Sequence, residues 1–188
     1  MSLALPIAAG GCRRTLAAGL LTLAANAMAA DPAPPEVAAS LPTADLQGQG
    51  TMRFFGLPVY DARLWAGAGF SAERYPAQAF ALELRYARAL RGAAIAQRSV
   101  AEMRRIDRVD DAQALAWKNA LMPAIPDVAV GDRLTGVYIP GEGTRFFHNG
   151  RSTSAVADPA FARLFFGIWL AATTSEPGLR RQLIGSGP

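Results

Sequence analysis

One segment near the C-terminus constrains the fold more than any other part of this sequence. Residues 158–170 read DPAFARLFFGIWL. Asp158 is a favourable N-cap and Pro159 suits the first helical position, so a helix is predicted to begin here. Its apolar residues recur at helical spacing and fill most of the remaining circumference, with Arg163 as the only charge after the cap. A helix that is apolar nearly all round is buried, so we predict a core built around it, with a sheet wrapped over it.

Residues 1–30 have the pattern of a secretory signal peptide. Arg13 and Arg14 precede an apolar run, 15–30, that ends in small residues suited to cleavage. The run is short for a membrane span, so we expect no stable span after cleavage and a periplasmic location, reached by the general or the twin-arginine route. Cleavage would also remove Cys12, the only cysteine, which leaves a chain without disulfides.

The rest of the chain is predicted to form one domain. Residues 31–45 are rich in proline and alanine and indicate an extended leader, so the domain is expected to occupy 46–188. Without residues 1–30, which hold two arginines and no acid, the formal net charge falls from +4 to +2. The arginines are scattered and not interleaved with aromatic residues, so we expect no nucleic-acid partner. The oligomeric state is left open.

The order of strand and helix patterns predicts an α+β domain. Alternating, β-favouring segments occur on both sides of two helical segments, and Asn149-Gly150 is a strong signal for a hairpin. We expect the helices to pack on one face of an antiparallel sheet. The predicted strands are 51–55, 59–65, 80–90, 133–140, 144–148 and 151–156, and the predicted helices are 91–107, 110–123, 158–170 and 176–184.

Residues that would carry common chemistries are sparse. His148 is the only histidine and flanks the predicted turn, so a zinc site is not expected. A serine nucleophile in a G-x-S-x-G elbow is absent. Gly48-x-Gly50 and Gly67-x-Gly69 lack a third glycine before a helix, so neither predicts a dinucleotide or phosphate loop, and we expect no cofactor.

Four segments occur in a combination that is specific although each is weak alone. They are 52–62, 84–92, 147–150 and 165–170, within a span of about residues 47–186. Together they resemble the chalcone isomerase-like family, in its bacterial secreted branch. The resemblance implies an open-faced β-sandwich, in which an antiparallel sheet is covered by a helical layer with a ligand cleft between the two.

The resemblance argues against the family's enzymatic chemistry here. Plant enzymes of this fold cyclise a chalcone to a flavanone, which requires a cation for the developing oxyanion and hydroxyl groups to orient a water molecule. The family's polar positions fall near Thr43, Phe55, Ile95, Glu102 and Leu164, and none of these matches. We therefore expect no catalytic residues.

The same replacements favour an apolar ligand. Non-catalytic plant relatives bind fatty acids, with arginine and tyrosine on the carboxylate, and a charged head group in an apolar cleft needs such a partner. The resemblance places Arg53, Arg85 and Arg98 near the inferred cleft, where tyrosines would add hydroxyl groups. The predicted ligand-binding residues are Arg53, Phe55, Tyr60, Arg85, Ile95, Arg98 and Leu164.

Three functions follow as hypotheses. The first is a periplasmic, non-catalytic protein that binds a small apolar or amphipathic ligand such as a fatty acid. The second is an isomerase or intramolecular lyase that acts on an unidentified enone through Arg53, Arg85 or a tyrosine. The third is a cell-envelope interaction module that docks through the aromatic residues of 144–148.

Overall fold

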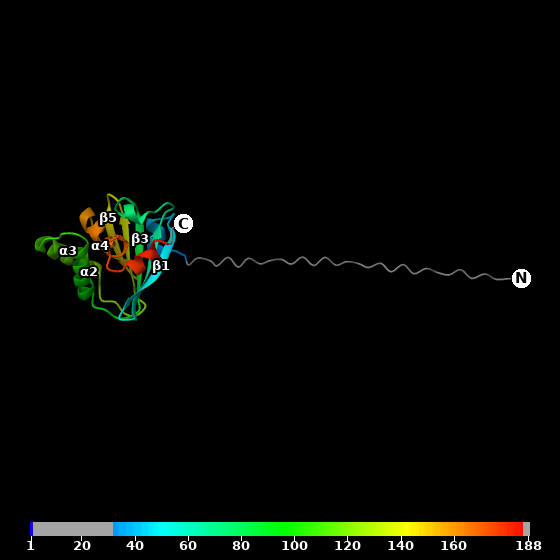
Figure 1. Ribbon diagram of the computed structural model, residues 1–188, viewed down its shortest axis with the longest axis horizontal. Coiled ribbons are helices and arrows are strands. Elements are labelled where there is room, and N and C mark those ends of the chain that lie inside the picture. Colours follow the sequence, from blue (N-terminus) through cyan, green and yellow to red (C-terminus); the bar gives the residue numbers. More distant parts are fainter. Residues whose placement is uncertain (2–31, 186–188) are drawn as a thin grey trace. The chain divides into compact units, whose positions relative to one another are not determined.

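A six-stranded antiparallel sheet forms the framework of the domain in the computed structural model, which describes Met1 and residues 32–185 (Figure 1). Each strand pairs with the next one in the sequence, so the sheet order is β1-β2-β3-β4-β5-β6. The strands are β1 (Asp45–Phe54), β2 (Leu57–Ala66), β3 (Phe80–Tyr86), β4 (Arg133–Ile139), β5 (Gly143–His148) and β6 (Arg151–Val156). Every predicted strand is present. The predicted signal peptide lies outside the described residues apart from Met1.

The helical layer covers one face of this sheet. Figure 1 shows α2 (Gly92–Ile106), α3 (Asp111–Ala124) and α4 (Pro159–Leu170) on the same side of the strands. A short 3₁₀ helix, η1 (Ala72–Ala77), joins β2 to β3, and α5 (Pro177–Leu183) ends the described chain. Within residues 32–185 no helix is both long and apolar enough to cross a membrane.

Helix α4 is the centre of the core, as its composition predicts. The Asp158 carboxylate accepts hydrogen bonds from the amides of Ala160 and Phe161 and so caps the helix. The Phe166 ring meets Phe80 of β3 edge to face, with the ring centroids 4.7 Å apart. Burying a side chain of this size contributes about 1.5–3 kcal/mol, so α4 and the sheet stabilise each other. The buried residues of α4 are Phe161, Ala162, Leu164, Phe165, Phe166, Gly167, Trp169 and Leu170.

Helix α5 packs on the face of the edge strand β1. It approaches so closely that a Cβ at Gly48 would overlap the backbone carbonyl oxygens of Gln182 and Leu183. A Cβ at Gly50 would meet the side chain of Gln182 in the same way. Glycine at these two positions therefore lets α5 lie directly on the face of β1 that belongs to the main core.

The leader differs from the prediction of an extended tether. Residues Pro35–Ser40 form a helix, α1, with proline at its first position. Val37 is fully buried and packs with Trp65, Ala81 and Val137 in a second apolar cluster on the sheet face away from α4. The tether prediction is wrong for this segment because a single turn with one apolar residue gives little helical signal, and its stability comes from the sheet.

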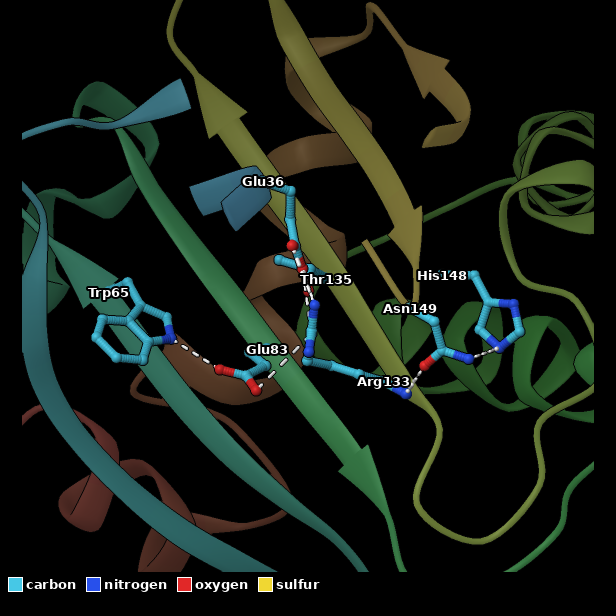
Figure 2. Close-up of polar contacts among 7 residues, drawn as sticks. All are labelled: Glu36, Trp65, Glu83, Arg133, Thr135, His148 and Asn149. Atoms are coloured by element: carbon cyan, nitrogen blue, oxygen red, sulfur yellow. Dashed lines mark hydrogen bonds and ion pairs between the residues drawn. The ribbon is translucent and has the colours of Figure 1, made fainter. Parts of the chain in front are cut away.

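A buried polar network also holds α1 to the sheet (Figure 2). Arg133 on β4 donates to the Glu36 carboxylate through Nε at 3.2 Å and Nη2 at 3.0 Å, and the Thr135 hydroxyl donates to it at 2.8 Å. The second buried carboxylate, Glu83, accepts from the Trp65 indole at 3.0 Å and lies 4.0 Å from Arg133 Nε. One guanidinium therefore serves two buried carboxylates, which is costly to disturb.

We expect Arg133→Met to lower the free energy of unfolding by about 3–5 kcal/mol, because it leaves Glu36 and Glu83 buried without their shared cation. The matched control is Arg151→Met, since Arg151 is exposed on β6 and makes no side-chain hydrogen bond or ion pair within residues 32–185. Urea unfolding at neutral pH measures both. Equal stabilities of the two variants would contradict the role given to Arg133.

Candidate functional site

A cavity of about 370 Å³ lies between the sheet and helices α2 and α4. Leu82, Leu84 and Phe146 contribute to its sheet side, and Ile95 and Trp169 to its helical side. Most of its lining is aliphatic or aromatic. The volume lies within the range of about 300–1,000 Å³ that is usual for ligand pockets. The cleft that the fold resemblance implied is therefore present and open.

The strands produce this cavity through their alternation. Leu82, Leu84 and Tyr86 occupy every second position of β3 and so share the face that looks toward α4. Leu82 pairs in register with Gly136 of β4, which has no side chain to fill the space. The Phe166 ring lies 3.1 Å from the place where a Cβ of residue 136 would stand. The Phe166 ring thus packs where a side chain of residue 136 would stand, and both residues form part of the cavity wall.

The interior of the cavity contains two tyrosine hydroxyls. Tyr60 accepts a hydrogen bond from the Trp169 indole at 3.0 Å, and burial raises the pKa of Tyr60 to about 12. Burial also raises the pKa of Tyr86, whose ring lies 5.8 Å from that of Tyr60. Within residues 32–185 the Tyr86 hydroxyl has no hydrogen-bond partner. Both groups are neutral at physiological pH, so they offer hydrogen bonds and no charge.

A buried carboxylate lies in the wall that α2 forms. Glu102 is bound by Arg98 at 2.7 Å, by the Ser175 hydroxyl at 2.8 Å and more distantly by Arg105 at 3.6 Å. Arg98 is therefore already engaged by an opposite charge. This ion pair makes the Arg98 guanidinium less available to an anionic ligand.

The exposed members of the lining mark where the cavity reaches the surface. They are Phe54, Arg88, Ala94, Arg98 and Ser175. Arg88 differs from Arg98 because, in the described part of the chain, it makes no hydrogen bond or ion pair. Arg88 is consequently the unengaged cation at the mouth.

The family model for chalcone isomerase-like proteins matches residues 28–185. The chain belongs to the chalcone isomerase-like family. A similar solved structure is the crystal structure of a fatty-acid binding protein of Arabidopsis thaliana, AtFAP1, with 12% sequence identity and a TM-score of 0.58. The similarity covers 76% of this chain and 87% of that chain. No curated protein matches the sequence. The predicted family and the predicted α+β fold, an open sheet with a helical layer, are confirmed.

In this chalcone isomerase-like domain, three of the predicted ligand-binding residues line the cavity: Tyr60, Ile95 and Arg98. The other four do not. Arg53 is exposed and donates to the Gly56 carbonyl at 3.2 Å, and Phe55 is 91% exposed in the β1–β2 turn. Arg85 is exposed on the sheet face that carries α1, and Leu164 is buried in the core behind the cavity lining.

The alternation of side chains along β3 explains why Arg88 reaches the cavity mouth and Arg85 does not. Arg85 has the opposite parity to Leu84 and Tyr86, so its side chain leaves the other face of β3. Arg88 continues the parity of Leu84 and Tyr86 just beyond the end of β3, and it lines the cavity. Arg88 was not among the residues predicted from the sequence, although the alternation through residues 82–88 was a signal that could have found it.

The turn that carries His148 is a structural feature at the same end of the sheet. His148 Nε2 lies 3.2 Å from Asp132, and the Asn149 amide donates to Asp132 at 2.9 Å (Figure 2 shows His148 beside Asn149). The Ala129 amide, then Asn149 and His148, lower the pKa of Asp132 to about 2. His148 was also predicted from the sequence to lie beside this hairpin turn. In residues 32–185 no three His, Cys, Asp or Glu side chains form a group that could hold a metal ion.

We expect alkaline pH to destabilise the protein through its buried tyrosines. The folded pKa of Tyr60, about 12, lies above that of an unfolded chain. The unfolded chain therefore ionises first, so this stabilisation is full below about pH 10 and is lost as pH rises through about 12. The two-unit difference corresponds to about 3 kcal/mol.

The test is urea unfolding of the wild type and Tyr60→Phe across this pH range. The variant should be less stable at neutral pH by about 1–2 kcal/mol, because the Trp169 indole loses its acceptor. It should also lose less stability between about pH 10 and about pH 12. The same alkaline loss in both proteins would show that Tyr60 does not carry it.

Proposed function

We propose that this chalcone isomerase-like protein binds a single-chain amphipathic lipid, such as a fatty acid, without changing it chemically. The observation that carries the proposal is an apolar cavity with Arg88 at its mouth, an arginine that has no partner within residues 32–185. The fatty-acid binding described for the Arabidopsis thaliana neighbour agrees with this proposal. The signal-peptide pattern of residues 1–30 supports a periplasmic site of action.

The acyl chain occupies the apolar interior in this proposal. Leu82, Leu84, Phe146 and Phe166 surround that space, and each methylene group transferred there from water contributes about 0.8 kcal/mol. Trp169 donates to the Tyr60 oxygen, whereas the Tyr60 proton and the Tyr86 hydroxyl have no partner within residues 32–185, so they are the polar groups that an acyl chain would meet there.

The carboxylate stays at the mouth. An anionic group carried into the interior would lose its hydration without meeting a free cation, because Arg98 is paired with Glu102. At the mouth, the Arg88 guanidinium offers charge-assisted hydrogen bonds in the planar geometry that a carboxylate accepts. The ligand therefore lies with its tail inward and its head at the surface.

Catalysis receives less support from the geometry. The cations named for an isomerase, Arg53 and Arg85, lie outside the cavity lining, and Tyr60 is held by Trp169. The Tyr86 hydroxyl is the one feature that favours a second function, since it is free to donate to the carbonyl of an enone. Turnover of hydroxychalcones that depends on Tyr86 would favour the isomerase, and rates equal to those in buffer would count against it.

The interaction-module hypothesis also receives less support. It required an exposed aromatic surface on strand β5. Phe146 is only 4% exposed and belongs to the core, and Phe147 is half-buried against the cluster that α1 completes. We therefore do not assign docking to this strand.

The role proposed for Arg88 predicts that its loss lowers the affinity for a fatty acid. Arg88→Ala should weaken the binding of a long-chain fatty acid about tenfold, because it removes a charge-assisted contact worth about 1.5 kcal/mol. Arg85→Ala is the matched control, since Arg85 is also exposed at this end of β3 but leaves the opposite face. Titration with a fluorescent fatty acid measures both. An equal effect of the two substitutions would refute the role of Arg88.

The cavity itself makes the second prediction. Ala94→Trp places a large ring at the mouth and should abolish the loading of lipid, whereas Ala93→Trp should not, because Ala93 is exposed but does not line the cavity. Native mass spectrometry of protein purified from its own host, followed by solvent extraction, measures the load. A wild-type protein without any lipid mass, and unchanged after incubation with fatty acids, would refute the proposed function.

A further inference from the structure

The tip of the β1–β2 hairpin exposes an unusual amount of apolar surface. Phe54 is 53% exposed, Phe55 91% and Leu57 63%, and the Phe54 and Phe55 rings meet edge to face with centroids 4.6 Å apart. Three large exposed apolar side chains thus occur within four consecutive residues. Val130, which is 70% exposed, lies in the loop at the same end of the sheet. Isolated exposed apolar residues need no explanation, but a cluster of them does.

The backbone of this turn makes its composition more informative. Phe55 and Gly56 have φ values of 49° and 79°, the left-handed pair of a two-residue hairpin turn. The β5–β6 turn has nearly the same angles, 51° and 82°, but uses the favoured residues Asn149 and Gly150. An aromatic residue at a left-handed position is strained and is also exposed here. The turn itself does not require Phe55, and its exposed ring is available for a contact outside the chain.

The surroundings of the tip are basic. The segments 52–61 and 85–94, which the β2–β3 pairing brings to this end of the sheet, contain four arginines and one acidic residue, Asp61, and the loop that carries Val130 adds Asp127 and Asp132. The arginines are Arg53, Arg85, Arg88 and Arg91, and all four are exposed. An apolar tip with a basic collar is complementary to a bilayer that carries anionic lipids, because the rings enter the interface while the guanidinium groups meet the head groups.

The tip is also part of the cavity mouth. Phe54 lines the cavity and is exposed, so a single side chain connects the apolar interior with the apolar tip. Arg88 stands at the same opening. In Figure 1 this end of the sheet is the lower end of the strands.

We propose that the β1–β2 hairpin tip inserts into the surface of an anionic phospholipid bilayer and holds the cavity mouth against it. The rings of Phe54 and Phe55 and the Leu57 side chain enter the interfacial region, and the four arginines contact the head groups. This contact rests on the proposed function in one respect, namely that it gives an amphipathic lipid an entry path that avoids water. The bilayer contact itself depends only on the tip and its charges.

The experiment uses protein purified from its own host and vesicles of phosphatidylcholine with or without phosphatidylglycerol. Co-sedimentation compares the wild type with Phe55→Asn, which restores the favoured Asn-Gly turn and should fold at least as stably. Leu115→Asn is the control, since Leu115 is 58% exposed on α3. We expect binding to the anionic vesicles that weakens with salt, a loss of about tenfold or more in Phe55→Asn and no change in Leu115→Asn.

Each of the other possible results bears on the bilayer contact or on the proposed function. The inference fails if the wild type does not sediment with anionic vesicles, or if Phe55→Asn binds as the wild type does. If the wild type binds no vesicles but retains a host protein that Phe55→Asn does not retain, the tip binds a protein and the inference of a bilayer contact fails. Lipid load, measured by mass spectrometry on the same samples, separates the two proposals. A wild type that binds vesicles but carries no lipid supports the bilayer contact of the hairpin tip and counts against the proposed function.

Discussion

The burial of α4 is the constraint on which the rest of the domain depends. Its aromatic and aliphatic residues leave no face suited to water, so the sheet must cover one side and α2 another. At Gly167 the two helices come so close that a Cβ would stand 3.1 Å from the Ile106 side chain. At Gly136 the Phe166 ring of α4 packs closely on the sheet, and both residues line the cavity. The candidate ligand site thus lies directly against the most buried element.

Much of the framework could be predicted because its signals are local. Strand alternation, the Asp158 cap and the Asn149-Gly150 turn each act over a few residues, and the structure has an element at every place they indicate. The helix α1 was missed because its stability comes from Arg133 and Thr135, which lie about a hundred residues further along the chain. A contact of that separation leaves no trace in the composition of residues 31–45.

The candidate site could be predicted only in part, for a related reason. The family resemblance indicated that a cleft exists, and Tyr60, Ile95 and Arg98 do line it. The choice of Arg85 instead of Arg88 ignored a difference in strand parity that the sequence already contained. Arg98 and Glu102 are one helical turn apart, so their ion pair could also have been predicted from the sequence. The burial of Glu102, which makes the pair strong, depends on the tertiary structure.

The distribution of charge explains how such a site can both hold and release a lipid. In the described lining, Glu102 is paired with Arg98, both tyrosines keep their protons, and Glu176 carries a carboxylate that has no ion pair within residues 32–185. Arg88, which has no partner among the same residues, stands at the rim. A carboxylate bound there never has to cross the apolar interior, so transfer requires only that the tail slide past Phe54. Release against a bilayer then exchanges one apolar environment for another, which costs little compared with release into water.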